Sequence, residues 1–140
     1  MTPLSIDGLV QEMKDLDASD LHLTVGSRPV VRRRGDLEAL DHHEVLNGEL
    51  TRDMLYQILS TEQQKVLETR RYIDMAYSVP GIARFRVNAF FQRNTVGAAL
   101  RLIPTEIRSL EELGFPSHVS KLATKPRGLV LVTGPTGSGK

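Results

Sequence analysis

At residues 84–91 the sequence reads RFRVNAFF, and apolar residues occupy every second position from Phe85 onward. A period of two is typical of a strand with one buried face and one polar face. The apolar face comprises Phe85, Val87, Ala89 and Phe91, and the opposite face carries Arg84, Arg86 and Asn88. This stretch therefore predicts a strand of an antiparallel sheet whose polar face presents arginines.

Two neighbouring segments extend this pattern into a sheet. Residues 72–79 alternate before a Pro-Gly turn, and residues 96–103 follow a short polar turn. Short connections between alternating strands favour a three-stranded antiparallel meander. If the apolar faces of these strands pack together, Arg101 joins Arg84 and Arg86 on one polar sheet surface.

The first part of the chain supplies helices and further strands. Apolar residues at helical spacing over residues 6–13 predict an amphipathic helix. The other expected elements are strands at 20–25 and 30–34, a loop at 41–50, a helix from Thr51 and a second helix over 60–70. The capping-box spacing of Ser60 and Gln63 marks the start of this second helix. Together they predict an α/β fold of the α+β type, an antiparallel sheet with flanking helices.

The composition is that of an ordinary globular protein. The 140 residues are 40% hydrophobic and 25% charged, with a formal net charge of +1 and no cysteine. Disulfides and thiolate catalysis are therefore excluded, and the weak net charge argues against nucleic acid as a partner. No signal peptide and no apolar stretch of the ~20 residues that a membrane span needs is visible. We expect a cytoplasmic protein without direct membrane insertion.

The C-terminal stretch of the sequence contains a phosphate-binding motif. Residues 129–132 form a continuous apolar run, which predicts a strand buried on both faces. The next residues, Gly134-Pro135-Thr136-Gly137-Ser138-Gly139-Lys140, satisfy the Walker A pattern of glycine, four residues, glycine and lysine. The glycines let backbone N–H groups surround phosphate oxygens, and the lysine reaches the β- and γ-phosphates. This combination predicts a P-loop ATPase.

The motif is incomplete at Lys140. The following Ser or Thr, whose hydroxyl ligates Mg²⁺, lies beyond residue 140. We expect ATP and Mg²⁺ as cofactors of the complete protein and no turnover by these 140 residues alone. The expected domains are 1–104, a linker with short helices over 105–126, and the start of an ATPase domain over 127–140.

Histidines offer two weaker candidate sites. His22 lies between two leucines of a predicted strand, where a histidine is more often structural. His42 and His43 are adjacent on an extended segment, so their side chains should point apart, and a metal site is not expected without outside ligands. The sequence alone therefore predicts no metal-binding residue.

Several stretches together identify a family. They are residues 18–23, 80–81, 83–90, 101–104, 110–114 and 127–140. In these stretches the chain closely resembles the PilT-type retraction ATPases of type IV pili, within the wider family of secretion and pilus ATPases. The Walker A motif alone is generic, whereas its combination with the 84–91 strand is specific.

The resemblance implies a PAS-like N-terminal domain followed by a RecA-like ATPase domain, of which the chain carries the first strand and the start of the P-loop. It also implies a ring of six copies that powers pilus retraction, with nucleotide between the two domains. Arginines of the N-terminal domain then reach the phosphates, and the matching positions are Arg86, Arg101 and Arg84. Implied partners are further copies of the chain and a pilus platform protein at the inner membrane.

Other interpretations remain open at this stage. By composition alone the arginines form a solvated face or ion pairs with Asp74 or Glu106. A pilus-assembly or type II secretion ATPase shares the same motifs, although such proteins usually carry longer N-terminal extensions. A non-enzymatic PAS-like interaction module is the alternative from a different functional class.

Overall fold

The structure is a computed structural model that describes residues 4–104 and 108–134. The chain divides into two compact units, Met1–Ile103 and Pro104–Lys140. The division between residues 103 and 104 lies beside the predicted end of the first domain. The finer division of residues 105–140 stays a prediction.

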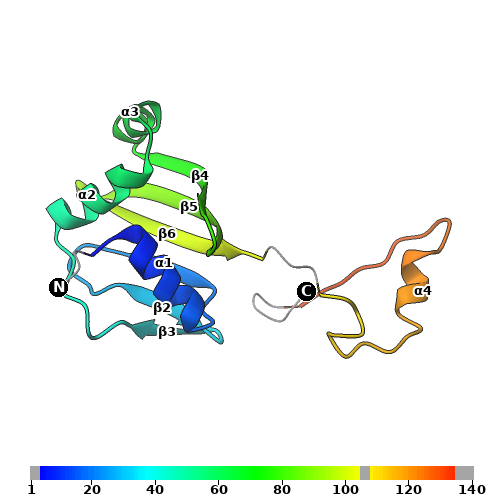
Figure 1. The fold of residues 1–140 in the computed structure, drawn as a ribbon. Coiled ribbons are helices and arrows are strands. Elements are labelled where there is room, and N and C mark those ends of the chain that lie inside the picture. The colour runs from blue at the N-terminus through cyan, green and yellow to red at the C-terminus, as the bar shows by residue number, and fades with distance from the viewer. Residues whose placement is uncertain (1–3, 105–107, 135–140) are drawn as a thin grey trace. The chain divides into compact units, whose positions relative to one another are not determined.

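Unit 1 is built on one six-stranded sheet in the order β3-β2-β1-β6-β5-β4 (Figure 1). The strands are β1 Asp20–Leu23, β2 Val30–Arg33, β3 Asp36–Ala39, β4 Tyr72–Val79, β5 Ala83–Gln92 and β6 Thr95–Ile103. Every neighbouring pair is antiparallel. The predicted meander is therefore confirmed as β4, β5 and β6, and the pairing of β1 with β6 joins it to the first three strands.

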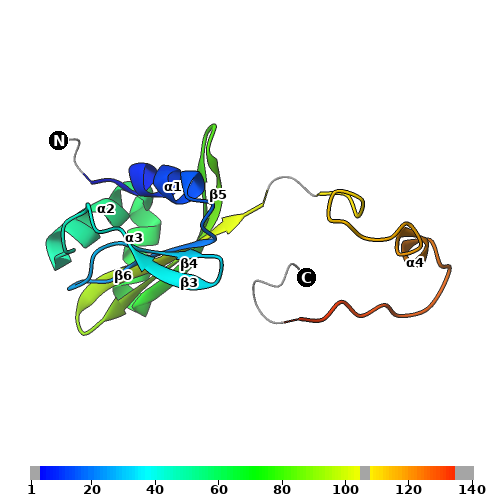
Figure 2. The same cartoon turned by 90° about the horizontal axis from the view of Figure 1, so that it is seen from below.

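Three helices, α1 Ile6–Asp15, α2 Gly48–Ile58 and α3 Thr61–Arg70, complete unit 1. Their apolar residues join the inward residues of the sheet in a single core, and in the described part of this unit no helix covers the other sheet face (Figure 2). The core includes Phe85, Val87 and Leu100, all with no exposed surface. The predicted antiparallel sheet with flanking helices is confirmed, and its polar face is left open.

β6 approaches β1 very closely at one glycine. A Cβ atom added to Gly97 would lie 2.9 Å from the backbone carbonyl oxygen of Leu23 and 3.4 Å from the Phe90 ring. Real Cβ atoms do not approach a backbone oxygen so closely, so this position requires glycine if the two strands are to pair at this distance.

Helix boundaries follow the capping residues. Ser60 and Gln63 form both hydrogen bonds of the predicted capping box at the start of α3. The predicted start of α2 at Thr51 is wrong by one turn, because the helix begins at Gly48. The Asn47 side chain accepts a hydrogen bond from the Leu50 amide at 2.8 Å and so caps α2 inside the predicted loop.

Strand β3 was not predicted from the sequence. All four of its residues are exposed at the edge of the sheet, so it has no buried apolar face that would mark it. Arg34 and Gly35 adopt positive φ values of 51° and 95° and turn the chain from β2 into β3. This pair of left-handed residues is typical of a tight hairpin turn.

Unit 2 contains less regular structure. Ser109 and Glu112 form the two hydrogen bonds of a capping box, and α4 spans Ser120–Ala123. The predicted strand at 129–132 is not formed, because no described segment pairs with it, and its side chains are between 55% and 82% exposed. None of the helices in the described ranges is long and apolar enough to cross a membrane.

Candidate functional site

The open face of the sheet brings charged residues of four strands into one row. Strand register places Arg32 opposite Asp20, Asp20 opposite Arg101, and Arg101 opposite Arg86. These residues come from β2, β1, β6 and β5, which are consecutive in the sheet. Arg84 shares the face but lies opposite Ile103, two residues along β5 from Arg86.

Two carboxylates accompany the directly opposed arginines. Like charges opposite each other destabilise a sheet unless other charges compensate them. Arg101 Nε donates to Asp20 Oδ1 at 2.8 Å, and Arg86 Nε lies 3.8 Å from Asp74 Oδ1. The ion pair with Asp74 that the sequence suggested is thus present for Arg86, whereas Glu106 lies outside the described residues.

Asp20 is the best-buried charged residue of this row. Its side chain is 9% exposed, and its Oδ2 accepts a hydrogen bond from Ser19 Oγ at 2.7 Å. Burial opposes ionisation of this carboxyl. The hydrogen bonds from Ser19 and Arg101 and the positive charge of Arg101 outweigh that effect, so the pKa of Asp20 lies below its ordinary value. Asp20 is therefore a fixed anion that orients Arg101.

Replacing Asp20 by Asn is expected to lower the free energy of unfolding by about 1–2 kcal/mol at neutral pH, a value limited by the solvent exposure of Arg101. The pKa of Asp20 is lower in the folded than in the unfolded chain. Its contribution is therefore present above the ordinary value of 3.8 and is lost as the pH falls through the folded-state pKa. Urea denaturation of both proteins from neutral pH down to about pH 3 tests this. A difference that does not shrink on acidification would contradict it.

A shallow pocket of about 240 Å³ opens over this part of the face. Its lining residues are Asp20, His22, Asp74, Arg86, Asn88, Ala99 and Arg101. His22 stands opposite Ala99, and its Nε2 atom is buried without a hydrogen-bond partner. The sequence suggested a structural role for His22. Its place beside Arg101 follows from the β1–β6 register, which local sequence patterns do not reveal.

The arginines keep donors for a ligand. Arg101 uses Nε to bind Asp20, and a guanidinium carries five N–H donors in a planar fork. The side chains of Arg86 and Arg101 are 70% and 66% exposed. These exposed guanidinium groups fit a ligand that carries several anionic oxygens, such as a nucleoside triphosphate.

The other predicted site residues are less informative. Arg84 does not line the pocket. Gly134 belongs to an irregular segment, and Pro135, Thr136, Gly137, Ser138, Gly139 and Lys140 lie outside the described residues. Their role in phosphate binding stays a prediction.

The expectation for the adjacent histidines is corrected by the structure. The rings of His42 and His43 do not point apart, because their centroids are 4.2 Å from each other. Both Nε2 atoms reach the carboxylate of Glu12 on α1, at 2.8 Å and 2.7 Å. Sequence reasoning could not anticipate the contact with Glu12, since this residue lies about 30 residues away along the chain.

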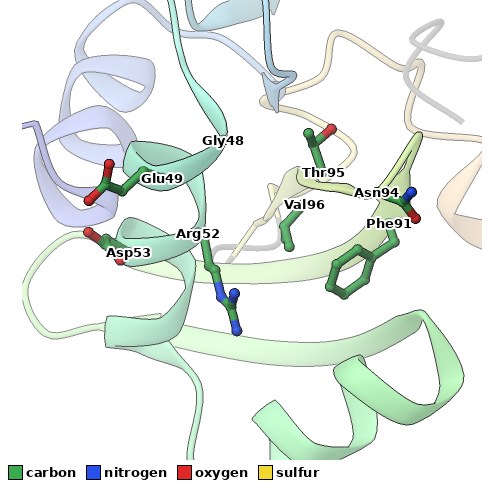
Figure 3. Close-up of a pocket in the computed structure, with 8 residues that line it drawn as sticks. All are labelled: Gly48, Glu49, Arg52, Asp53, Phe91, Asn94, Thr95 and Val96. Carbon is green, nitrogen blue, oxygen red and sulfur yellow. The ribbon is translucent and has the colours of Figure 1, made fainter.

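A second pocket of about 460 Å³ lies between the start of α2 and the β5–β6 hairpin (Figure 3). Arg52 is held there by Glu68 at 2.8 Å, and the guanidinium of Arg71 lies 3.7 Å from the centre of the Phe91 ring. The acidic side chains of Glu49 and Asp53 point away from Phe91. Its lining carries two carboxylates, Glu49 and Asp53, but only one arginine, so this pocket is a weaker candidate for an anion than the open sheet face with its two arginines.

Comparison with known proteins identifies relatives over most of the chain. It is 44% identical over 128 residues to the type IV pilus retractation ATPase PilT of Pseudomonas aeruginosa, which covers 88% of this chain and 36% of the relative. It is 41% identical over 112 residues to a twitching motility protein of Neisseria gonorrhoeae, covering 80% of this chain and 30% of the relative. The chain thus spans about a third of the length of these relatives.

A solved structure agrees with these sequence relatives. The pilus retraction motor PilT with bound ADP matches with a TM-score of 0.78 and 42% identity, over 98% of this chain and 40% of that structure. The predicted resemblance to PilT-type ATPases is confirmed by these matches. The model of the family described as Type II/IV secretion system protein matches residues 2–140. The chain belongs to this family of type II/IV secretion system proteins.

Proposed function

We propose that the chain is the N-terminal part of a hexameric motor that hydrolyses ATP to retract type IV pili. The observation that carries the proposal is the opposed pair of exposed arginines, Arg86 and Arg101, on the open sheet face. The Walker A sequence at 134–140 supplies the second phosphate-binding element. The names of the relatives support retraction as the task of the complete protein.

In this proposal the residues of the open face orient and bind phosphate oxygens. Bound ATP with Mg²⁺ would supply the phosphoryl group that is transferred to water. Asp20 positions Arg101 by fixing its Nε, so that the outer N–H groups of the guanidinium face the ligand. Arg86 contributes a second fork from the neighbouring strand. Planar forks match pairs of phosphate oxygens, which a lysine cannot do.

The rest of the proposal concerns the complete protein. We infer a cytoplasmic motor that acts at the inner membrane through a platform protein of the pilus machinery.

Deletion of the gene in its own organism tests the task of the motor. A strain without a retraction motor should keep surface pili but lose twitching, because assembly continues while withdrawal stops. We expect this phenotype, measured by electron microscopy of pili and by spreading on agar. Loss of the pili themselves would instead indicate an assembly ATPase, and normal twitching with failed protein secretion would indicate a secretion ATPase.

Complementation separates the motor from the non-enzymatic alternative. Wild-type protein should restore twitching, whereas a Lys140→Ala variant produced at the same level should not, because the motif loses its phosphate-binding charge. Restoration of twitching by the Lys140→Ala variant would show that the protein works without its phosphate-binding lysine. In that case the interaction-module interpretation would replace the motor.

A further inference from the structure

A cluster of three metal-ligating side chains lies away from the arginine pocket. Glu12 on α1 is bound through both of its carboxylate oxygens, by His42 Nε2 at 2.8 Å and by His43 Nε2 at 2.7 Å. One ligand atom from each of the three residues lies within 4.8 Å of the other two. Two imidazole nitrogens and a carboxylate oxygen thus point at one place.

The loop that carries the two histidines is anchored at both ends. Leu40 and Leu46 are buried in the core, with 5% and 1% exposure. The Leu40 amide donates to the Pro29 carbonyl at 2.9 Å, and the Leu46 amide donates to the Ser27 carbonyl at 2.9 Å. Both ends of the segment between them are therefore fixed. Less conformational entropy is lost when a ligand orders a segment that is already held at both ends.

Further contacts hold His43 itself. The His43 amide donates to the Leu40 carbonyl at 3.0 Å, and the guanidinium of Arg28 donates to the His43 carbonyl. Arg28 Nε also lies 3.8 Å from Asp41 Oδ1. On the other side, Glu12 is part of α1, whose Leu9 and Met13 are buried in the core. Backbone contacts of this kind pre-organise a ligand set before the ion arrives.

We propose that Glu12, His42 and His43 form a binding site for a divalent transition-metal ion, with Zn²⁺ as the best match. Two histidines and one carboxylate are a ligand set that zinc uses where it keeps an open coordination position. Imidazole nitrogen also suits Ni²⁺, Co²⁺ and Cu²⁺, whereas Mg²⁺ and Ca²⁺ require oxygen ligands. This site is therefore chemically distinct from a Mg²⁺–nucleotide site.

Metal binding requires the three ligand atoms, which now lie within 4.8 Å of one another, to move to the spacing of a coordination shell. Ligand atoms at tetrahedral positions about 2.0–2.1 Å from zinc are separated by about 3.3 Å, slightly more than the present nitrogen–oxygen distances. The side chain of His42 is 63% exposed and can move by that amount. The ion would lie between the Nε2 atoms of the two histidines and the carboxylate of Glu12. Each histidine would then be neutral, with its ring proton on Nδ1. Water fills the remaining position.

Occupancy would link two parts of unit 1 that are far apart in sequence. Glu12 belongs to α1, and the histidines belong to the loop between β3 and α2. An ion held by both would tie α1 to that loop and raise the thermal stability of the unit, since a ligand that binds the folded chain stabilises it. The remaining histidines, His22 and His118, take no part in the cluster.

Zinc titration of the 140-residue chain, monitored by calorimetry in a large excess of Mg²⁺, tests the proposal. We expect one Zn²⁺ per chain. His43→Gln and Glu12→Gln should each weaken binding at least about tenfold, because each removes one of three ligands. His118→Gln and Glu62→Gln are matched controls on exposed residues outside the cluster, and they should leave the affinity unchanged.

A second measurement uses the wild-type chain, so its result does not depend on whether the variants fold. In NMR spectra, Zn²⁺ should shift the ring signals of His42 and His43 and leave those of His22 and His118 in place. Equal shifts at His118, or an affinity that survives His43→Gln in a folded variant, would overturn the proposal. Absence of any Zn²⁺ binding in the presence of Mg²⁺ would overturn it as well.

Discussion

Replacing Arg101 by Ala in the complete protein is expected to lower the turnover number for ATP by about 10³-fold or more, the range of an arginine that stabilises phosphoryl transfer. The expectation follows from the position of Arg101, which Asp20 fixes through Nε while the outer guanidinium stays exposed. Arg86→Ala should have an effect of the same kind, because the two residues are opposed across β5 and β6. Steady-state phosphate release measures both variants.

A matched control separates loss of catalysis from loss of folding. Arg33 lies on β2 outside the pocket, where it faces Glu38 at 3.8 Å. Arg33→Ala should therefore keep wild-type turnover. Circular dichroism melts should show that all three variants are folded. The exposed pairs of Arg86 and Arg33 contribute about 0–1 kcal/mol, and loss of the Arg101–Asp20 contact is expected to cost about 1–2 kcal/mol. Turnover of Arg86→Ala and Arg101→Ala within experimental error of the wild type would refute the assignment of phosphate contacts to these arginines.

Replacing Phe85 by Ala is expected to lower the free energy of unfolding of unit 1 by about 3–5 kcal/mol. Phe85 is the largest of the fully buried side chains and points from the middle of β5 into the core. Alanine would remove most of the apolar contact area and leave a cavity that the surrounding sheet and helices can fill only in part. Urea denaturation followed by circular dichroism gives the difference directly.

The control for this change is an aromatic residue on the neighbouring strand. Tyr72 begins β4 and is 54% exposed, so Tyr72→Ala should change the stability by about 0.5 kcal/mol or less. A loss below about 1 kcal/mol for Phe85→Ala would mean that β5 does not pack as described. Such a result would also remove the structural basis for placing Arg86 on the open face, because the two residues alternate along one strand.

Local features of this fold could be predicted from the sequence. Alternation over residues 84–91 assigned the buried and polar faces of β5, and the Ser60–Gln63 capping box located the start of α3. Both patterns involve residues that are close together in the sequence, so they can be recognised without knowing the tertiary structure. The exposed strand β3 lacked such a signal, since none of its residues contributes to the core.

Contacts between distant segments could not be predicted in the same way. The opposition of Arg86 and Arg101 follows from a meander with a short turn, and alternation anticipated their common face. The approach of Asp20 to Arg101 depends on pairing between β1 and β6, which no local periodicity encodes. The contact of His43 with Glu12 likewise depends on how α1 packs beside a loop.

The order of strands has a consequence for synthesis on the ribosome. β1 ends at Leu23, whereas its partner β6 is complete only at Ile103, about 80 residues later. At translation rates of about 5–20 residues per second, this interval lasts roughly 4–16 s. During that time β2 can pair with one edge of β1, and β3 can pair with β2. The other hydrogen-bonding edge of β1 stays open. The nascent chain therefore exposes a strand edge for several seconds, a period in which chaperone binding and aggregation compete with folding.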